Sequence, residues 1–243
     1  MDIAKIYVGS NPDFARLKND PVEMQKFVER LDGHQEFVVK PSHGSEGRGI
    51  TVVTGHDGET FRTLGHEPLH LADLCYHLST ILSGLYSLAG QPDCAIVEQR
   101  ILLHPAFQHV AIGGTPDIRI VLYRCVPVMA MVRLPTRASR GRANLHQGAV
   151  AAAVQLRSGE TFGGVHRSRI VAVHPDTGAS LGGLRIPFWE KMLRAAAHLA
   201  EALELGYVGV DFVLDATRGP VVLEANARPG LAIQLANRCG LLS

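Results

Sequence analysis

GVDFVLDATRGPVVLEANARPG, residues 209–230, indicates two apolar strands joined by a Gly/Pro turn. A four-residue turn between Asp215 and Pro220 makes these two residues a cross-strand pair, and the residue numbers of all pairs in the hairpin then have the same sum. In that register Asp211 lies opposite Glu224. The hairpin is therefore predicted to hold two carboxylates directly across from each other on neighbouring strands.

A divalent cation is one way to accommodate this arrangement. Like charges directly opposite each other repel, and Asn226 adds an amide oxygen on the face of Glu224 because side chains alternate along a strand. Mg²⁺ is typically held by one or two carboxylates together with substrate phosphates. The alternative is a solvated hairpin edge with ordinary surface acids. The apolar character of both strands, typical of a buried sheet, favours a magnesium site at Asp211, Glu224 and Asn226.

The composition excludes several classes of protein. The 243 residues include 24 Lys+Arg and 23 Asp+Glu, and the net charge of +1 gives no field to attract nucleic acid or an anionic membrane. The four cysteines have no C-x-x-C spacing and are interpreted as free thiols in a reducing compartment. We see neither a basic-then-apolar leader nor an apolar run of the ~20 residues that span a membrane. We expect a globular cytoplasmic protein without nucleic-acid or membrane partners.

The order of elements predicts an α+β fold, because strand-like segments follow one another without the alternation of a doubly wound fold. Helices are predicted over residues 20–31, from Pro68 to about Leu88, and from Pro187 to about Leu205. Leucines in the second helix recur every three or four residues, which suits either a core or a homodimer interface. Strands are predicted at 6–8, 37–40, 50–53, 95–101, 118–123, 126–132 and 149–156.

A second candidate site is the Gly-rich segment VVKPSHGSEGRGI, residues 38–50, in which Lys40 ends an apolar strand. Glycines allow backbone N–H groups to approach phosphate oxygens, and a lysine adds a compact positive charge. The segment lacks the terminal Gly-Lys-Ser/Thr of a Walker A loop, and it returns to a strand where a Rossmann fingerprint opens a helix. The alternative is a plain hairpin with a flexible turn.

Arginines form the third candidate site. Arg119 and Arg133 lie in apolar strand sequences, where an arginine is rare without an anionic or carboxylate partner. A breaker-rich loop then carries Asn144 and His146, which we interpret as site residues. Its three arginines suit either a clamp for an acidic group or a solvated basic surface. Glu98 is either an edge charge or an acceptor for ribose hydroxyls.

Residues 66–70, HEPLH, match the H-E-x-x-H pattern of zinc proteases. That pattern needs both histidines on one face of a continuous helix, whereas Pro68 favours a helix start between them. We therefore do not expect a zinc site.

Taken in order, these segments resemble the ATP-grasp superfamily, specifically RimK-type proteins similar to α-L-glutamate ligases. The resemblance runs from about residue 37 onwards and is carried by FVVKPSHGSEGRGI, VEQR, PDIRI, ANLHQGA, GYVGVDFVLD and LEANARPG. It implies two α+β lobes that bind ATP between them. The N-terminal lobe, residues 1–100, would carry the Gly-rich lid, and the C-terminal lobe, residues 101–243, would carry the magnesium hairpin. The N-terminal region that precedes the first lobe in family members is expected to be absent or shortened.

The resemblance also implies a role for each candidate residue. Lys40 would contact ATP phosphates, and Glu98, Gln99 and Arg100 would form the hinge that holds adenine and ribose. The lid would consist of residues Ser42, Gly44, Ser45, Gly47 and Gly49. The γ-phosphate and an acyl phosphate would be contacted by residues Arg119, Arg133 and Asn144. Arg228 would lie beside the metal residues, and His146 is assigned to nucleotide binding.

The implied activity is an ADP-forming, ATP-dependent ligase that joins a carboxylate to an amine through an acyl phosphate. Its substrates would be small molecules or peptides. The arginines favour an acidic substrate such as glutamate, although phosphate alone explains them equally well. The alternative is a non-catalytic ATP-binding module, motivated by the shortened N-terminal region.

Overall fold

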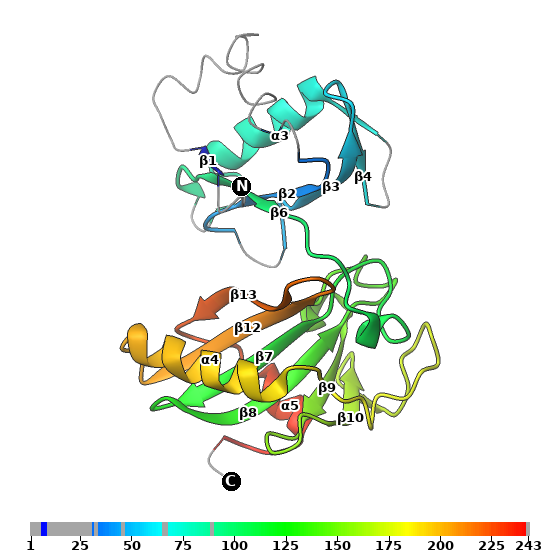
Figure 1. Ribbon diagram of the computed structural model, residues 1–243, viewed down its shortest axis with the longest axis vertical. Helices are drawn as coiled ribbons and strands as arrows, with labels where there is room; N and C mark the ends of the chain where they lie inside the picture. Colours follow the sequence, from blue (N-terminus) through cyan, green and yellow to red (C-terminus); the bar gives the residue numbers. More distant parts are fainter. Residues whose placement is uncertain are drawn as a thin grey trace. The chain divides into compact units, whose positions relative to one another are not determined.

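The computed structural model describes residues 6–8, 31, 34–44, 47–64, 68–87 and 90–241. The chain divides into two compact units, Met1–Arg100 and Ile101–Ser243 (Figure 1). Each unit is built on an antiparallel sheet accompanied by helices, which confirms the α+β prediction. No helix in the described ranges is both long enough and apolar enough to cross a membrane.

The first unit contains a sheet of strand order β1-β6-β2-β3-β4-β5. The strands are β1 (Ile6–Val8), β2 (Phe37–Pro41), β3 (Thr51–His56), β4 (Thr60–Thr63), β5 (Leu69–His70) and β6 (Ala95–Gln99). Helix α3 (Leu71–Leu82) packs on β2 and β6. Phe37 and Val39 of β2 join the core beneath this helix, and so Lys40 of the same strand belongs to the opposite face of the sheet.

Helix α3 is shorter than predicted. The residues after Pro68 form β5, and the helix ends at Leu82. Gly84 follows with a φ of +84°, and a Cβ there would lie 2.1 Å from a backbone oxygen, so the chain must leave the helix at this point. The predicted row of leucines therefore does not continue along one helix, and Leu85, beyond the helix end, is 70% exposed. Leu88 and nearly all of the predicted helix at 20–31 lie outside the described residues.

The second unit contains a sheet of strand order β11-β10-β9-β8-β7-β12-β13. The strands are β7 (Asp117–Tyr123), β8 (Val126–Leu134), β9 (Val150–Val154), β10 (Thr161–His166), β11 (Arg169–Val171), β12 (Tyr207–Asp215) and β13 (Gly219–Asn226). The short strands β4, β5, β10 and β11 are not in the sequence-based prediction. The predicted strands are all present, with ends that differ by a few residues.

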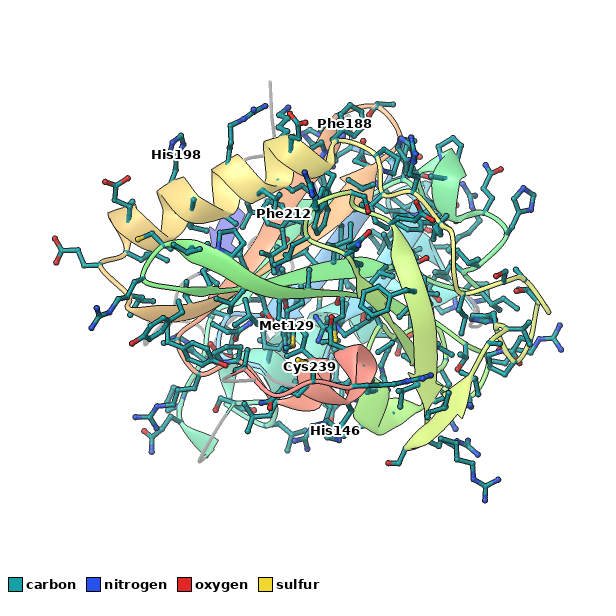
Figure 2. All side chains as sticks on the ribbon, turned by 90° about the horizontal axis from the view of Figure 1, so that it is seen from below. Met129, His146, Phe188, His198, Phe212 and Cys239 are labelled. Atoms are coloured by element: carbon teal, nitrogen blue, oxygen red, sulfur yellow. The ribbon has the colours of Figure 1, made fainter. Side chains whose placement is uncertain are left out.

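Two helices cover opposite faces of the second sheet. Figure 2 shows Phe212 between the sheet and α4 (Trp189–Ala202), and Met129 on the other face beside α5 (Ala232–Asn237). The α4 face is the larger core, to which β7 contributes Ile118 and its even-numbered neighbours. On the α5 face β7 contributes Val121. Because α5 packs on β8, β9 and β10, it leaves the β7–β12–β13 part of that face to other side chains.

Helix α4 begins later than predicted. Its N-cap is Phe188, which has a left-handed backbone with a φ of +58° and an exposed side chain. Phe188 therefore does not belong to the buried apolar face, which is formed by Trp189, Met192, Ala196 and Ala200. The indole N–H of Trp189 donates to the carbonyl oxygen of Leu156 at 2.7 Å and fixes the start of the helix against the sheet.

Candidate functional site

The terminal hairpin has a tighter turn than predicted. Asp215 pairs with Gly219 and Leu214 pairs with Pro220, so the predicted pairing of Asp215 with Pro220 is wrong. Gly219 has a φ of +74°, which glycine adopts without strain, and it therefore closes the shorter turn.

A bulge restores the predicted register farther along the hairpin. Phe212 pairs with Val222, and the next pair is Asp211 with Glu224, so Leu223 is the extra residue of β13. The predicted juxtaposition of Asp211 and Glu224 is thus confirmed. Asn226 donates from Nδ2 to Oε1 of Glu224 at 2.9 Å, which places the amide beside the carboxylates as predicted.

The two strands of the hairpin differ in burial. Strand β12 is buried almost throughout, whereas β13 is the edge strand of the sheet and is largely exposed. The side chain of Asp211 is 2% exposed and that of Glu224 is 59% exposed. The expectation of a doubly buried hairpin is therefore wrong for β13. The carboxylates form a pair with one buried member and one accessible to solvent.

Both strand arginines lie on the face that carries Asp211. Arg119 of β7 pairs across the sheet with Asp211, and Arg133 of β8 pairs with Asp117 of β7. Side-chain alternation puts Asp117 and Arg119 on the face of Val121, the face on which α5 packs. The charged groups therefore lie on the same face of the sheet as α5, on strands β7, β8 and β12.

These four residues form a continuous ion-pair network. Asp211 accepts from Nε of Arg119 at 2.7 Å and from Nη2 of Arg133 at 2.8 Å. Arg119 also donates to it from Nη2, and Arg133 donates from Nε to Asp117. Arg119 and Arg133 are 11% and 12% exposed, so the network is largely removed from water. Glu224 completes it, with Oε1 3.9 Å from Nη2 of Arg119.

The pKa values of the two buried carboxyls in the network are shifted in opposite directions. Burial raises the pKa of Asp117 to about 7, because it outweighs the charge of Arg133 and is reinforced by the charge of Asp211. Burial also acts to raise the pKa of Asp211, but the hydrogen bond of Arg119 and the charges of both arginines lower it below its usual value. Burial acts to lower the pKa of Arg133, yet its two carboxylate partners raise it. Asp211 is thus the firmly ionised carboxylate of the network.

Asp117 was missed in the sequence analysis, although its signal was present. The stretch Asp117–Ile118–Arg119 places a carboxylate and a guanidinium on the same face of one strand. A charged pair at alternate positions of an apolar strand indicates a buried polar cluster. Its partner on β8 was not predictable, because the register of β7 against β8 depends on a tight hairpin at Arg124 and Cys125 and on an irregularity near Val121.

Asn144 and His146 lie in the loop between β8 and β9. Asn144 is the N-cap of a short 3₁₀ helix, η3 (Leu145–Gln147), and its side chain accepts from the backbone N–H of His146 at 2.9 Å. His146 is exposed. Since β8 ends and β9 starts at the end of the strands where Arg133 lies, the topology brings this loop to the same end of the sheet as the arginine network.

Buried and half-buried side chains hold both ends of this loop. His174 is fully buried, and its Nε2 lies 3.1 Å from the carbonyl oxygen of Pro135 at the start of the loop. His166 Nε2 lies 3.1 Å from the carbonyl oxygen of Gly148 at the end. Thr136 Oγ1 donates to the same oxygen of Gly148 at 2.7 Å. These contacts give the loop a defined conformation at both attachments.

In the first unit, Lys40 and Glu98 form an ion pair with 2.6 Å between Nζ and Oε2. They lie on neighbouring strands, where Val38 pairs with Glu98 and Lys40 pairs with Ile96. Both side chains therefore share the face of the sheet opposite α3. The structure brings together two residues that the sequence analysis assigned to different parts of ATP.

The Gly-rich segment is anchored at both described ends. The backbone N–H of Ser42 donates to the carbonyl oxygen of Cys94 at 2.8 Å, and Gly44 forms an isolated bridge with Ser87. At the other end the carbonyl oxygen of Gly49 lies 3.0 Å from Nε2 of His77.

Glycine is required at position 49. Gly49 has a φ of +74°, and a Cβ there would lie 2.6 Å from the ring of Tyr86. Gly47 also has a positive φ, whereas Ser45 lies outside the described residues.

The remaining candidate residues occupy strand ends. Gln99 is the last residue of β6, and Arg100 after it donates from Nη1 to Oε1 of Glu36 at 2.8 Å. Arg228 follows β13 and is exposed.

Within the described ranges, no three His, Cys, Asp or Glu side chains are grouped as a metal site. His66 and Glu67 of the H-E-x-x-H pattern lie outside those ranges.

The sequence matches the family described as "sugar-transfer associated ATP-grasp" over residues 2–243. The chain belongs to this ATP-grasp family. No curated protein matches the chain. ATP-grasp membership confirms the superfamily to which the sequence was expected to belong, and the RimK type stays a prediction.

The solved structures to which the chain is similar include ligases and a synthetase. D-cycloserine synthetase DcsG is 16% identical with a TM-score of 0.46, over 96% of this ATP-grasp chain and 62% of that chain. D-alanine–D-alanine ligase from Bacillus anthracis is 14% identical with a TM-score of 0.47, over 96% and 54%. ATP-grasp ligase PsnB with its minimal precursor is 13% identical with a TM-score of 0.43, over 97% and 49%. The chain thus spans about half to three fifths of the length of these proteins.

Proposed function

We propose that this ATP-grasp chain binds Mg·ATP and uses it to join a carboxylate to an amine. The observation that carries the proposal is the network on the α5 face of the second sheet, where Arg119 and Arg133 surround Asp211 opposite Glu224. Clustered guanidinium groups suit the oxygens of a transferring phosphoryl group and of a carboxylate. Membership of the ATP-grasp family supports ATP as the source of that phosphoryl group.

The donor set on the hairpin fits magnesium. Asp211 and Glu224 face each other, and Asn226 lies beside them, so the available ligands are oxygens. Mg²⁺ prefers this donor chemistry and combines one or two carboxylates with phosphate oxygens. Bound there, the ion would neutralise charge on the phosphates. Arg228, next to the end of β13, is proposed to add a positive charge on the same side.

The reaction we propose needs no protein nucleophile. An oxygen of the substrate carboxylate attacks the γ-phosphorus of ATP, the bond to the β-phosphate oxygen breaks, and ADP leaves. The amine nitrogen then attacks the carbonyl carbon of the acyl phosphate, inorganic phosphate leaves, and the nitrogen loses a proton. Arg119, Arg133 and Asn144 would stabilise the negative charge on the transferring group, a mainly electrostatic contribution.

The first unit would hold the remainder of the nucleotide. Lys40 would exchange Glu98 for phosphate oxygens, and Glu98 would then accept from ribose hydroxyls. Backbone groups at Gln99 and Arg100 would hold adenine. The anchored Gly-rich segment at Ser42–Gly49 would cover the phosphates and exclude water from the acyl phosphate.

For the carboxylate substrate we propose an acidic amino acid or peptide, with glutamate as the first candidate. Arg119 and Arg133 are both held by Asp211, while the loop that carries Asn144 contains further arginines. These loop arginines are proposed to bind an anionic side chain on the substrate.

The test is ADP release, with mass spectrometry of the products, in a screen of Mg·ATP with amino acids and peptides. We expect a product whose mass equals the two substrates less water, and loss of turnover in Glu224→Gln. The matched control is Glu190→Gln, an exposed acid on α4. Turnover that survives Glu224→Gln would contradict the metal assignment. Stabilisation by Mg·ATP without turnover for any substrate pair would instead identify a non-catalytic ATP-binding module.

A further inference from the structure

We propose that Arg119 and Arg133 occlude Asp211, so that a divalent cation and an anionic ligand must bind together, and that Asp117 is the positioning residue that retains Arg133 during this exchange. The inference rests on the proposed function, because it concerns the same hairpin. It adds that the hydrogen bonds between Asp211 and the two arginines control when the hairpin can bind a cation.

The acceptor positions of Asp211 are already largely used. Oδ1 accepts from Nε of Arg119, while Oδ2 accepts from Nη2 of Arg119 and from Nη2 of Arg133. A carboxylate offers about four acceptor positions, and here three hold charge-assisted hydrogen bonds. A cation that takes Asp211 as a ligand must therefore displace guanidinium groups that are themselves buried.

Displacement is unfavourable unless an anion replaces the carboxylate. Arg119 is 11% exposed, and both of its short contacts are to Asp211, with Glu224 at 3.9 Å. A buried guanidinium that loses its partner carries the full cost of an uncompensated charge. Arg119 and Arg133 balance the charges of Asp211 and Glu224, so a divalent cation alone would leave the site positive whatever the charge of Asp117. Phosphate oxygens would pair with the displaced guanidinium groups and would also neutralise the added positive charge.

The two arginines differ in the hydrogen bonds that remain when Asp211 binds a cation. If Asp211 no longer accepts from the arginines, Arg119 loses both of its close contacts, whereas Arg133 still donates from Nε to Asp117. Arg119 is therefore the arginine that is free to follow the incoming anion. Asp117 holds the guanidinium of Arg133 in place, with Nη2 directed toward Asp211.

The occlusion is tested by measuring Mn²⁺ binding by electron paramagnetic resonance, with and without a non-hydrolysable ATP analogue. Arg119→Gln should tighten binding of Mn²⁺ alone by about tenfold, because a competing donor is removed, and should weaken binding of Mn²⁺ with the nucleotide. Arg194→Gln removes an exposed arginine of α4 and should change neither.

Measurements at high salt distinguish the loss of the Arg119 contact with Asp211 from the general effect of removing one positive charge. At about 0.5 M KCl long-range fields are screened, and a tightening that depends on contact should persist. If Arg119→Gln leaves binding of Mn²⁺ alone unchanged, or if its effect vanishes in salt, the occlusion is overturned. If the wild-type protein binds Mn²⁺ no better with nucleotide than without it, the proposed function and the joint binding of cation and anion both fail. The arm without nucleotide still decides the occlusion.

The role of Asp117 is tested with a pair of variants. Asp117→Asn keeps an oxygen that can accept from Nε of Arg133, and Asp117→Ala removes it. We expect the Nε proton of Arg133 to be protected from exchange in NMR spectra of wild type and Asp117→Asn, and to lose protection in Asp117→Ala. Mn·nucleotide binding should follow the same order, with a loss of about tenfold for alanine. Equal protection in all three folded proteins would overturn the positioning role.

Discussion

Asp215 accepts a hydrogen bond from the backbone N–H of Leu102 at 2.9 Å, and so ties the end of β12 to the segment that begins the second unit. The same buried carboxylate accepts from the backbone N–H groups of Thr217 and Arg218 in the hairpin turn, each at 2.9 Å. A single side chain therefore organises the turn that follows β12 and the chain segment that lies beside it.

Asp215→Asn is expected to destabilise the second unit by about 2–4 kcal/mol, because buried hydrogen bonds to a charged acceptor are lost. Burial acts to raise the pKa of Asp215, but hydrogen bonds from Leu102, Thr217 and Arg218 outweigh it and lower the pKa. The unfolded chain thus binds more protons below pH about 4, where this contribution to stability is lost. Urea denaturation of both proteins at pH 7 and at pH 3 measures the difference, which should shrink at pH 3. A constant difference would contradict the assignment.

His174 is expected to make stability depend on pH near neutrality. Its Nδ1 accepts from the backbone N–H of Asp176 at 3.3 Å while Nε2 contacts Pro135, an arrangement that requires the neutral ring. Burial lowers the pKa of His174, outweighing the Pro135 hydrogen bond and the charge of Asp176, and the charge of His166 lowers it further. Its contribution is therefore present above pH about 6.5 and is lost as pH falls below that value.

The measurement for His174 is the free energy of unfolding of wild type and His174→Gln from pH 8 to pH 5. The advantage of wild type should decline as the pH falls. His198→Gln, an exposed histidine of α4, serves as the control (Figure 2). A profile for His174→Gln that runs parallel to wild type would rule out this dependence.

Gly49→Ala is expected to disrupt the base of the Gly-rich segment. Gly49 and Gly58 both have positive φ, but only at Gly49 would a Cβ meet another group, the ring of Tyr86 at 2.6 Å. Gly58→Ala therefore isolates the backbone cost of about 1 kcal/mol, and Gly49→Ala should cost about 1–3 kcal/mol more. Thermal unfolding of the two variants gives the comparison. Similar losses would mean that Tyr86 does not constrain the segment.

Gly219→Ala is expected to strain the hairpin turn, because Gly219 has a φ of +74°. We expect a loss of about 1 kcal/mol in the free energy of unfolding. Gly206→Ala is the matched control, since a Cβ at Gly206 would meet nothing within 4 Å and its φ lies outside the strained range. An alanine at position 219 that is no worse than one at 206 would show that the turn relaxes.

The α+β class and the pairing of Asp211 with Glu224 were determined by local pattern. Apolar alternation defines each strand, and the distance of each carboxylate from the turn limits which residues face each other. The pairing survives the wrong turn prediction because the bulge at Leu223 adds the residue that the tighter turn omits. The glycines that follow Lys40 are likewise evident in the sequence, and the phosphate-binding role of this segment stays a prediction.

The partners of the arginines were decided only by the tertiary structure. Arg133 meets Asp117 and Asp211 because β8, β7 and β12 lie side by side, and strand order between segments so distant in sequence depends on packing of the whole core. Lys40 meets Glu98 for the same reason. Periodicity determines which face a side chain occupies. The strand next to it, and therefore the charge that it meets, is determined by how the sheets and helices bury their apolar faces together.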